Sequence, residues 1–364
     1  MAVKSKIMIK ILSGSLFFTL IMSLWSCKSD LAFELNQRIK DPMDGNREFQ
    51  IYFATNRKSS SSSPRCSNDF FGTERANAFS YGSCNVNVPE AHAVGDLDDG
   101  TGDRNRDFQM GNFQPLPEQD FFNRVTENSD EVLFFVHGFN VRFEEAVYRA
   151  AQIKYDAKFQ GPVVLMTWPA GPGDGFLDSM LMNRTYTANQ INAQMTIAPA
   201  QELFLHLFSL NKKVHVVVHS MGHQIVLPAL ASISENLSRP AITELVLNAP
   251  DFPEREFKNV APALVKSAQR VTLYCSPADN ALIASEKLNG SRRIGMCAKV
   301  SGIDTINVNE IDSPALGIGG LGHGYYAGRP VIADLYQVLL GVEANRRLFI
   351  RVSRSPSENY VLRR

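Results

Sequence analysis

Residues 214–222 read Val-His-Val-Val-Val-His-Ser-Met-Gly, and this stretch decides the fold. A short valine-rich run that stops at a turn is typical of a strand buried on both faces of a sheet. The serine then matches the strand–turn–helix elbow G-x-S-x-G, except that Val218 stands in place of the first glycine. Such a turn lifts the hydroxyl of Ser220 out of the sheet and directs the N–H of Met221 towards the same site. An ordinary strand that ends in a capping serine is the alternative.

Strand and helix patterns alternate on both sides of this stretch. Strands are expected at 49–54, 81–88, 131–136, 163–168, 245–247, 271–274 and 304–308, and helices at 143–159, 183–210, from 221 onward and at 331–340. This alternation predicts an α/β fold with a mainly parallel, doubly wound sheet and helices on both faces. Residues 47–341 would form this domain, and 342–364, rich in arginine and serine, are expected to be a poorly anchored tail.

The first 26 residues are typical of a secretory signal peptide. Three lysines within the first ten residues precede an apolar run at 11–25, which is too short to span a bilayer comfortably. Residues 24–27, Leu-Trp-Ser-Cys, resemble a bacterial lipobox, in which Cys27 becomes the lipidated N-terminus. The polar stretch 27–46 would then be a tether, and a retained signal anchor is the alternative.

Either form of the N-terminus places the rest of the protein outside the cytoplasm. Lys28 follows the cysteine, and by resemblance to Gram-negative lipoproteins this favours the outer membrane, with the protein facing the periplasm.

Four further cysteines, Cys66, Cys84, Cys275 and Cys297, indicate disulfides, because the compartment is oxidising. Four cysteines allow three pairings. We favour the pairing that is local in sequence, Cys66 with Cys84 and Cys275 with Cys297. Buried free thiols are the alternative.

The composition argues against a nucleic-acid partner and gives only a weak indication of a metal site. The formal net charge is zero, so no electrostatic footprint points to nucleic acid. The acidic segment 95–103 has the look of a calcium-binding run, but it lacks the glycine position and the final glutamate of an EF-hand loop. No metal site is expected there.

A second oxyanion donor is expected directly after the strand at 131–136. Ligands of parallel α/β sheets bind beyond the carboxyl ends of the strands, and this strand ends at residues 137–140, His-Gly-Phe-Asn. Gly138 lets the backbone approach closely, so the N–H of Phe139 or of Asn140 is the candidate donor.

The order of the catalytic residues along the chain identifies the base. In hydrolases with this elbow the order is Ser, Asp or Glu, then His. Only His223 and His323 follow Ser220. His223 lies one helical turn after the serine, where it could shape the pocket but leaves little room for an intervening acid. His323, in the glycine-rich stretch 319–324, is therefore the expected base.

Two aspartates compete for the role of the acid that orients His323. Asp279 follows the second expected strand after the elbow, and Asp251 follows the first. We favour Asp279, because the acid usually follows that second strand and because Asp251 with Glu254 fits a helix capping box. Asp251 remains the alternative acid.

The motifs together resemble the α/β-hydrolase superfamily, and within it an uncharacterised bacterial branch catalogued as a domain of unknown function. They are A-T-N-R at 54–57, V-H-G-F-N at 136–140, W-P at 168–169, H-S-M-G at 219–222, A-P-D at 249–251 and G-H-x-Y at 322–325. The resemblance covers residues 49–340 and implies a hydrolase fold and an esterase-like activity, but no particular substrate. The branch commonly has asparagine after H-S-M-G, and His223 departs from this at the expected pocket mouth.

We therefore expect a lipid-anchored serine hydrolase that acts on a small acyl substrate: a carboxylic ester, thioester or amide. Ser220 would attack, His323 would transfer the proton, and the N–H groups of Met221 and Phe139 would hold the oxyanion. No metal or organic cofactor is expected. A non-catalytic surface lipoprotein that uses the same fold for binding is the alternative.

The segment 169–187 could form a cap over this site. Its apolar side chains could line an acyl pocket, although a packing role is equally compatible with them; they are Phe176, Leu177, Met180, Leu181 and Met182.

Overall fold

The computed structural model describes residues 46–61, 63–97, 103–172, 182–311 and 323–363. The fold below is that of the unit that spans residues 43–364. Several expectations lie outside the described residues: the signal peptide, Cys27, nearly all of the tether, most of the loop before His323, and four side chains of the expected cap (Phe176, Leu177, Met180 and Leu181).

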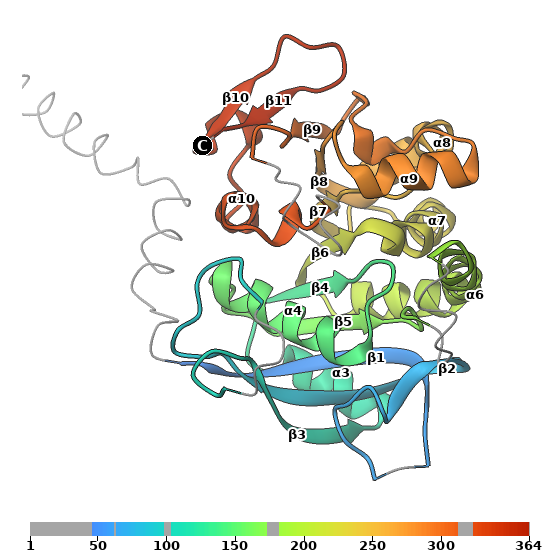
Figure 1. Cartoon of the computed structure of the whole chain (residues 1–364), viewed down its shortest axis with the longest axis vertical. Coiled ribbons are helices and arrows are strands. Elements are labelled where there is room, and N and C mark those ends of the chain that lie inside the picture. Colours follow the sequence, from blue (N-terminus) through green and yellow to red (C-terminus); the bar gives the residue numbers. More distant parts are fainter. Residues whose placement is uncertain (1–45, 62, 98–102, 173–181, 312–322, 364) are drawn as a thin grey trace, which may run out of the picture. The chain divides into compact units, whose positions relative to one another are not determined.

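An eleven-stranded sheet is the centre of the described fold, in the order β10-β11-β9-β8-β7-β6-β4-β5-β1-β2-β3 (Figure 1). The strands are β1 (Glu48–Ser59), β2 (Phe71–Asn87), β3 (Gln109–Leu116), β4 (Glu131–Val136), β5 (Val163–Thr167), β6 (Lys213–His219), β7 (Ile242–Asn248), β8 (Ala268–Cys275), β9 (Asp304–Asn307), β10 (Ile350–Val352) and β11 (Tyr360–Leu362). All neighbours from β1 across to β11 are parallel, whereas β2, β3 and β10 pair antiparallel at the two edges. The predicted mainly parallel sheet is confirmed.

Helices cover both faces of this sheet. They are α3 (Glu118–Thr126), α4 (Phe143–Asp156), α6 (Met182–Ser209), α7 (His223–Ile233), α8 (Glu254–Ser267), α9 (Asn280–Asn289) and α10 (Arg329–Leu339). Side chains of α4 and α10 pack in one core cluster, and side chains of α3, α6, α7 and α8 pack in the other. None of the described helices is both long enough and apolar enough to cross a membrane.

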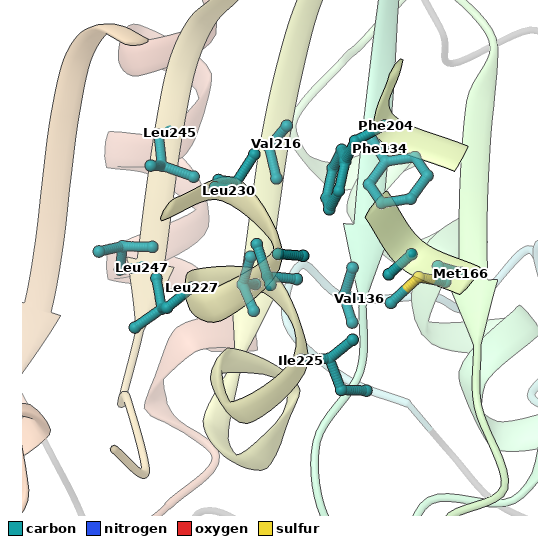
Figure 2. Packing of buried hydrophobic residues seen from close by; sticks show 14 of the residues in the cluster. Phe134, Val136, Met166, Phe204, Val216, Ile225, Leu227, Leu230, Leu245 and Leu247 are labelled. Atoms are coloured by element: carbon teal, nitrogen blue, oxygen red, sulfur yellow. The ribbon is translucent and has the colours of Figure 1, made fainter. Parts of the chain in front are cut away.

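The valine run of β6 is explained by its central place between these layers. Val216 and Val218 belong to the cluster with α6 and α7, while Val217 belongs to the cluster with α4. Figure 2 shows Val216 between Phe134 and Leu245 on the first of these faces. Each valine that leaves water contributes about 1.5–3 kcal/mol, so a strand covered on both faces needs no polar alternation.

The N-terminal third of the sheet differs from the expectation. Strands β1 and β2 are longer than predicted, and β3 and α3 were not predicted. The first half of β2 is largely exposed, and β3 lies at the sheet edge, so neither carries a strong hydrophobic pattern. Antiparallel pairing of β2 with β1 and of β3 with β2 orders these strands, and pairing between distant segments is not visible in local sequence.

The expectation of a poorly anchored tail at 342–364 is wrong. Strand β11 pairs with β9 in parallel, and β10 pairs with β11, so this segment completes one edge of the sheet. Arg347 is buried, and its guanidinium donates to Asp334 Oδ2 at 2.9 Å. Two three-residue strands and one buried ion pair are too short a signal for periodicity analysis to detect.

Both disulfides join the cysteines that are neighbours in sequence. Cys66 is bonded to Cys84 and Cys275 to Cys297, across separations of 18 and 22 residues. The first ties the loop after β1 to the C-terminal part of β2. The second ties the end of β8 to the turn after α9. Loop closure of this size stabilises a folded chain by typically 2–4 kcal/mol.

The adjacent residues Arg346 and Arg347 provide a matched test of the corrected C-terminal edge. In Arg347→Met the Asp334 carboxylate stays buried without its cation, so the free energy of unfolding should fall by about 3–5 kcal/mol. In Arg346→Met, whose side chain is 74% exposed, it should change by no more than about 0.5 kcal/mol. Urea unfolding measures both, and equal effects would contradict the structural role of Arg347.

Candidate active site

Ser220 lies in a strained turn directly after β6. Its φ is +51°, a left-handed conformation that costs a non-glycine residue about 1–3 kcal/mol. Two hydrogen bonds hold its carbonyl oxygen in this turn: the Asp251 N–H donates at 3.3 Å and His223 Nδ1–H donates at 2.7 Å. The nucleophile elbow read from the sequence is therefore present as a backbone conformation.

Close backbone approach explains the two glycines beside the elbow. A Cβ on Gly222 would lie 2.6 Å from the His137 carbonyl oxygen, and a Cβ on Gly138 would lie 2.7 Å from Ser220 Cβ. Neither space admits a side chain. Val218, by contrast, is fully buried in the core cluster of α6 and α7, so the missing first glycine of the motif does not prevent the turn.

Three side chains from separate segments form a continuous hydrogen-bonded chain. His323 Nε2 lies 2.7 Å from Ser220 Oγ, and His323 Nδ1 lies 2.7 Å from Asp279 Oδ2. With the Asp279 carboxylate as acceptor, Nδ1 carries the ring hydrogen and Nε2 is free to accept the serine proton. The structure thus brings together Ser220, His323 and Asp279, the residues expected as nucleophile, base and favoured acid.

Asp279 also forms the N-cap of α9. Its Oδ1 accepts from the N–H groups of Ala281 and Leu282, both at 3.1 Å, while Oδ2 faces His323. The side chain is fully buried. Because one oxygen is held by the helix, the other is presented to the imidazole in a single orientation.

Asp251 is not a helix cap, so its capping-box interpretation is wrong. Helix α8 starts at Glu254 with Pro253 as its N-cap. The Asp251 carboxylate is instead paired with Arg293 Nε at 3.1 Å, and both side chains are at most 4% exposed.

Two hydroxyl groups complete the partners of this carboxylate. Tyr186 Oη donates to Asp251 Oδ2 at 2.8 Å, and Ser285 Oγ donates to Asp251 Oδ1 at 2.6 Å. Asp251 therefore joins α6, α9 and the turn after β7. The sequence shows each of these residues but not which of them meet.

The turn after β4, residues 137–140, contains the two candidate oxyanion donors, and one of them already donates to a side chain. The N–H of Asn140 donates to Asn189 Oδ1 at 3.2 Å, which favours Phe139 as the donor. Phe139 and Ser220 both line the same pocket. Met221, the other expected donor, is the middle residue of the short helical turn Ser220–Gly222.

A buried polar network supports this turn from below. Trp168 Nε1–H donates to the His137 carbonyl oxygen at 3.0 Å, and the Trp168 N–H donates to His137 Nε2 at 3.2 Å. Burial lowers the pKa of His137 to about 3, so its ring is neutral and Nε2 can accept.

Arg57 extends the same network. Its Nε donates to Thr167 Oγ1 at 3.0 Å, and its other donors reach the carbonyl oxygens of Gly72, Ala170 and Val141. The A-T-N-R and W-P motifs are thus explained as support for the oxyanion turn, a role that the sequence analysis missed. The signal available was a pair of motifs near the carboxyl ends of β1 and β5, close to the end of β4, which His137 directly follows.

His223 lies under the elbow rather than at the pocket mouth. Its side chain is fully buried, and burial lowers its pKa to about 3, so the ring stays neutral. Its hydrogen bond to the Ser220 carbonyl gives this departure from the commoner asparagine a positioning role.

A pocket of about 190 Å³ opens onto Ser220 and His323. Its walls are mainly apolar, with Phe139, Tyr186, Leu282 and Leu288 among them. Met182 of the expected cap also lines it. Within the described ranges, no group of three or more His, Cys, Asp or Glu side chains is placed to hold a metal ion.

Comparison with known families agrees with this fold. A family described as "Alpha/beta hydrolase of unknown function (DUF900)" matches residues 116–343. The chain belongs to this family. The match spans more than half of the chain and includes Ser220, Asp279 and His323, and it confirms the resemblance drawn from the motifs. Searches of curated proteins and of solved structures found no match.

A pair of isosteric substitutions separates the two aspartates. Asp279→Asn keeps an oxygen for the α9 cap but lets the imidazole adopt the wrong tautomer, so ester turnover should fall about 10⁴-fold with little change in stability. Asp251→Asn leaves Arg293 without its counter-charge, so the free energy of unfolding should fall by about 3–5 kcal/mol. Assays with p-nitrophenyl butyrate and urea unfolding measure the two effects. An active Asp279→Asn protein beside an inactive but fully stable Asp251→Asn protein would reverse the assignment.

Proposed function

We propose that this protein is a serine hydrolase that cleaves a carboxylic ester through an acyl-enzyme, with thioesters and amides open to the same chemistry. The observation that carries the proposal is the chain of two 2.7 Å hydrogen bonds from Asp279 through His323 to Ser220. The strained φ of Ser220 adds support, because a binding protein has no need to hold a serine in this conformation.

The proposed reaction proceeds in two acyl transfers. Ser220 Oγ attacks the ester carbonyl while His323 Nε2 takes the hydroxyl proton, and Asp279 stabilises the imidazolium that forms. The N–H groups of Met221 and Phe139 hold the oxyanion. His323 then gives the proton to the departing alcohol. A water molecule, activated by the same imidazole, releases the acid and restores Ser220.

We further propose that the protein is a lipoprotein of the cell envelope, anchored through Cys27 and facing the periplasm from the outer membrane. The lipobox-like residues 24–27 and the preceding basic and apolar runs support this location. Two disulfides in the folded domain are compatible with an oxidising compartment.

Loss of the nucleophile tests the activity directly. Ser220→Ala should abolish labelling by a fluorophosphonate probe and reduce ester turnover by on the order of 10⁶-fold, by analogy with other triads. Ser209→Ala, at the exposed end of α6 and not among the residues that line the pocket, serves as a control that keeps full labelling. Undiminished labelling of Ser220→Ala would contradict the mechanism, since the probe would then react elsewhere.

Removal of the acylated cysteine tests the location. Cys27→Ala should shift the protein from the membrane fraction to the soluble fraction, because Cys27 is the proposed site of lipid attachment. Ser29→Ala is the control and should leave fractionation unchanged. Mass spectrometry of the purified protein should find a lipidated N-terminal Cys27, and an intact chain starting at Met1 would contradict the proposal.

A further inference from the structure

Arg149 brings a positive charge to the wall of the pocket that contains Ser220 and His323. It belongs to α4, the helix that follows the oxyanion turn. Its guanidinium donates to Gln152 Oε1 at 2.6 Å, which is a neutral partner. Within the part of the chain that the structure describes, no carboxylate lies within ion-pair distance of Arg149.

Aromatic stacking holds this guanidinium against the pocket wall. Its central carbon lies 5.7 Å from the centroid of the Tyr326 ring. The Tyr326 ring in turn stacks on His219, with centroids 3.7 Å apart, and His219 directly precedes Ser220. A guanidinium over an aromatic face loses little freedom when it binds a ligand, because it is already oriented.

The other charge in the pocket wall is already neutralised. Asp251 also lines the pocket, but its carboxylate is paired with Arg293. Burial lowers the pKa of His219 well below its usual value, and the nearby histidines and Arg149 lower it further, so His219 is neutral. Among the residues that the structure describes, Arg149 therefore leaves one positive charge without a counter-charge in a mainly apolar pocket.

We propose that Arg149 binds a carboxylate of the substrate, so that the ester cleaved at Ser220 carries a separate acidic group. A carboxylate fits a guanidinium through two parallel N–H···O bonds, and its single negative charge matches the single cation. The apolar walls would hold the carbon chain between the acid and the ester. That the substrate is an ester rests on the proposed function. That it carries a carboxylate rests on the pocket alone.

A binding experiment tests the carboxylate site without any turnover. The Ser220→Ala protein is titrated calorimetrically with monomethyl adipate and with dimethyl adipate, which differ by one charge. The monoanion should bind about ten- to a hundredfold more tightly. Adding Arg149→Met should remove this difference, and Arg149→Lys should restore part of it.

A matched control excludes a general effect of charge. Arg255→Met removes the same charge from an exposed position on α8 that does not line the pocket, and it should keep the preference for the monoanion. Equal binding of the two ligands to Ser220→Ala would overturn the inference. So would a preference that survives Arg149→Met, because the carboxylate would then bind at the oxyanion donors.

Kinetics then show on which side of the ester the acid lies. One pair of substrates is mono-p-nitrophenyl adipate and its methyl ester, with the acid on the acyl side. The other is the hexanoate ester of p-hydroxybenzoate and that of methyl p-hydroxybenzoate, with the acid on the leaving group. For each pair, kcat/KM of the acidic ester is divided by kcat/KM of the neutral ester. In the pair that places the acid near Arg149, this ratio should be about ten- to a hundredfold lower in Arg149→Met than in the wild type, chiefly because KM of the acidic ester rises.

The two proposals fail separately in these measurements. If the wild-type protein cleaves neither pair, the serine hydrolase proposal fails, while the titration still decides whether Arg149 binds a carboxylate. If it cleaves both pairs and neither ratio responds to Arg149→Met, the hydrolase proposal stands and the carboxylate site is wrong.

Discussion

The backbone of Ser220, packed between two glycines, is the constraint on which the site depends. Gly138 and Gly222 let the turn after β4 and the turn after β6 approach to distances that a Cβ would block. The left-handed conformation of Ser220 is maintained by bonds to its carbonyl oxygen from Asp251 and His223. This strain is offset by the buried parallel strands, which hold both turns at the same edge of the sheet. The proposed oxyanion donors and the serine hydroxyl come together for that reason.

Buried polar residues outside the Ser220–His323–Asp279 chain hold the turn after β4 in place. Trp168 and His137 hold the turn after β4, and Arg57 ties that turn to the ends of β1 and β5. Burial lowers the pKa of Arg57 to about 9, which shows how strongly its site desolvates the guanidinium. A cation satisfied mostly by backbone carbonyls locks loop geometry, because each carbonyl must keep its place. These contacts give a physical meaning to motifs that lie away from the triad.

Two aspartates and two arginines lie at or beside the site, and the surrounding residues give each member of a pair a different role. Asp279 shares its oxygens between a helix N-terminus and an imidazole, whereas Asp251 is neutralised by Arg293. Arg293 is therefore held by the Asp251 carboxylate, and Arg149 is the arginine that we propose binds a ligand. The resulting pocket is apolar with one cation, a combination suited to a carbon chain that ends in an acid.

The sequence by itself determined the fold class and the elbow at Ser220, and it singled out His323 as the candidate base. These follow from local signals: a β-branched run, a turn motif and the order of residues along the chain. The local disulfide pairing was also accessible, since each pair is close in sequence. Only the tertiary structure chose between Asp279 and Asp251, because both follow a buried strand and each had a plausible local role. It also placed the C-terminal segment in the sheet and, over the ranges that it describes, showed no carboxylate paired with Arg149. Those features depend on contacts between residues far apart in the chain, and short-range patterns carry no record of which distant partner a polar side chain will meet.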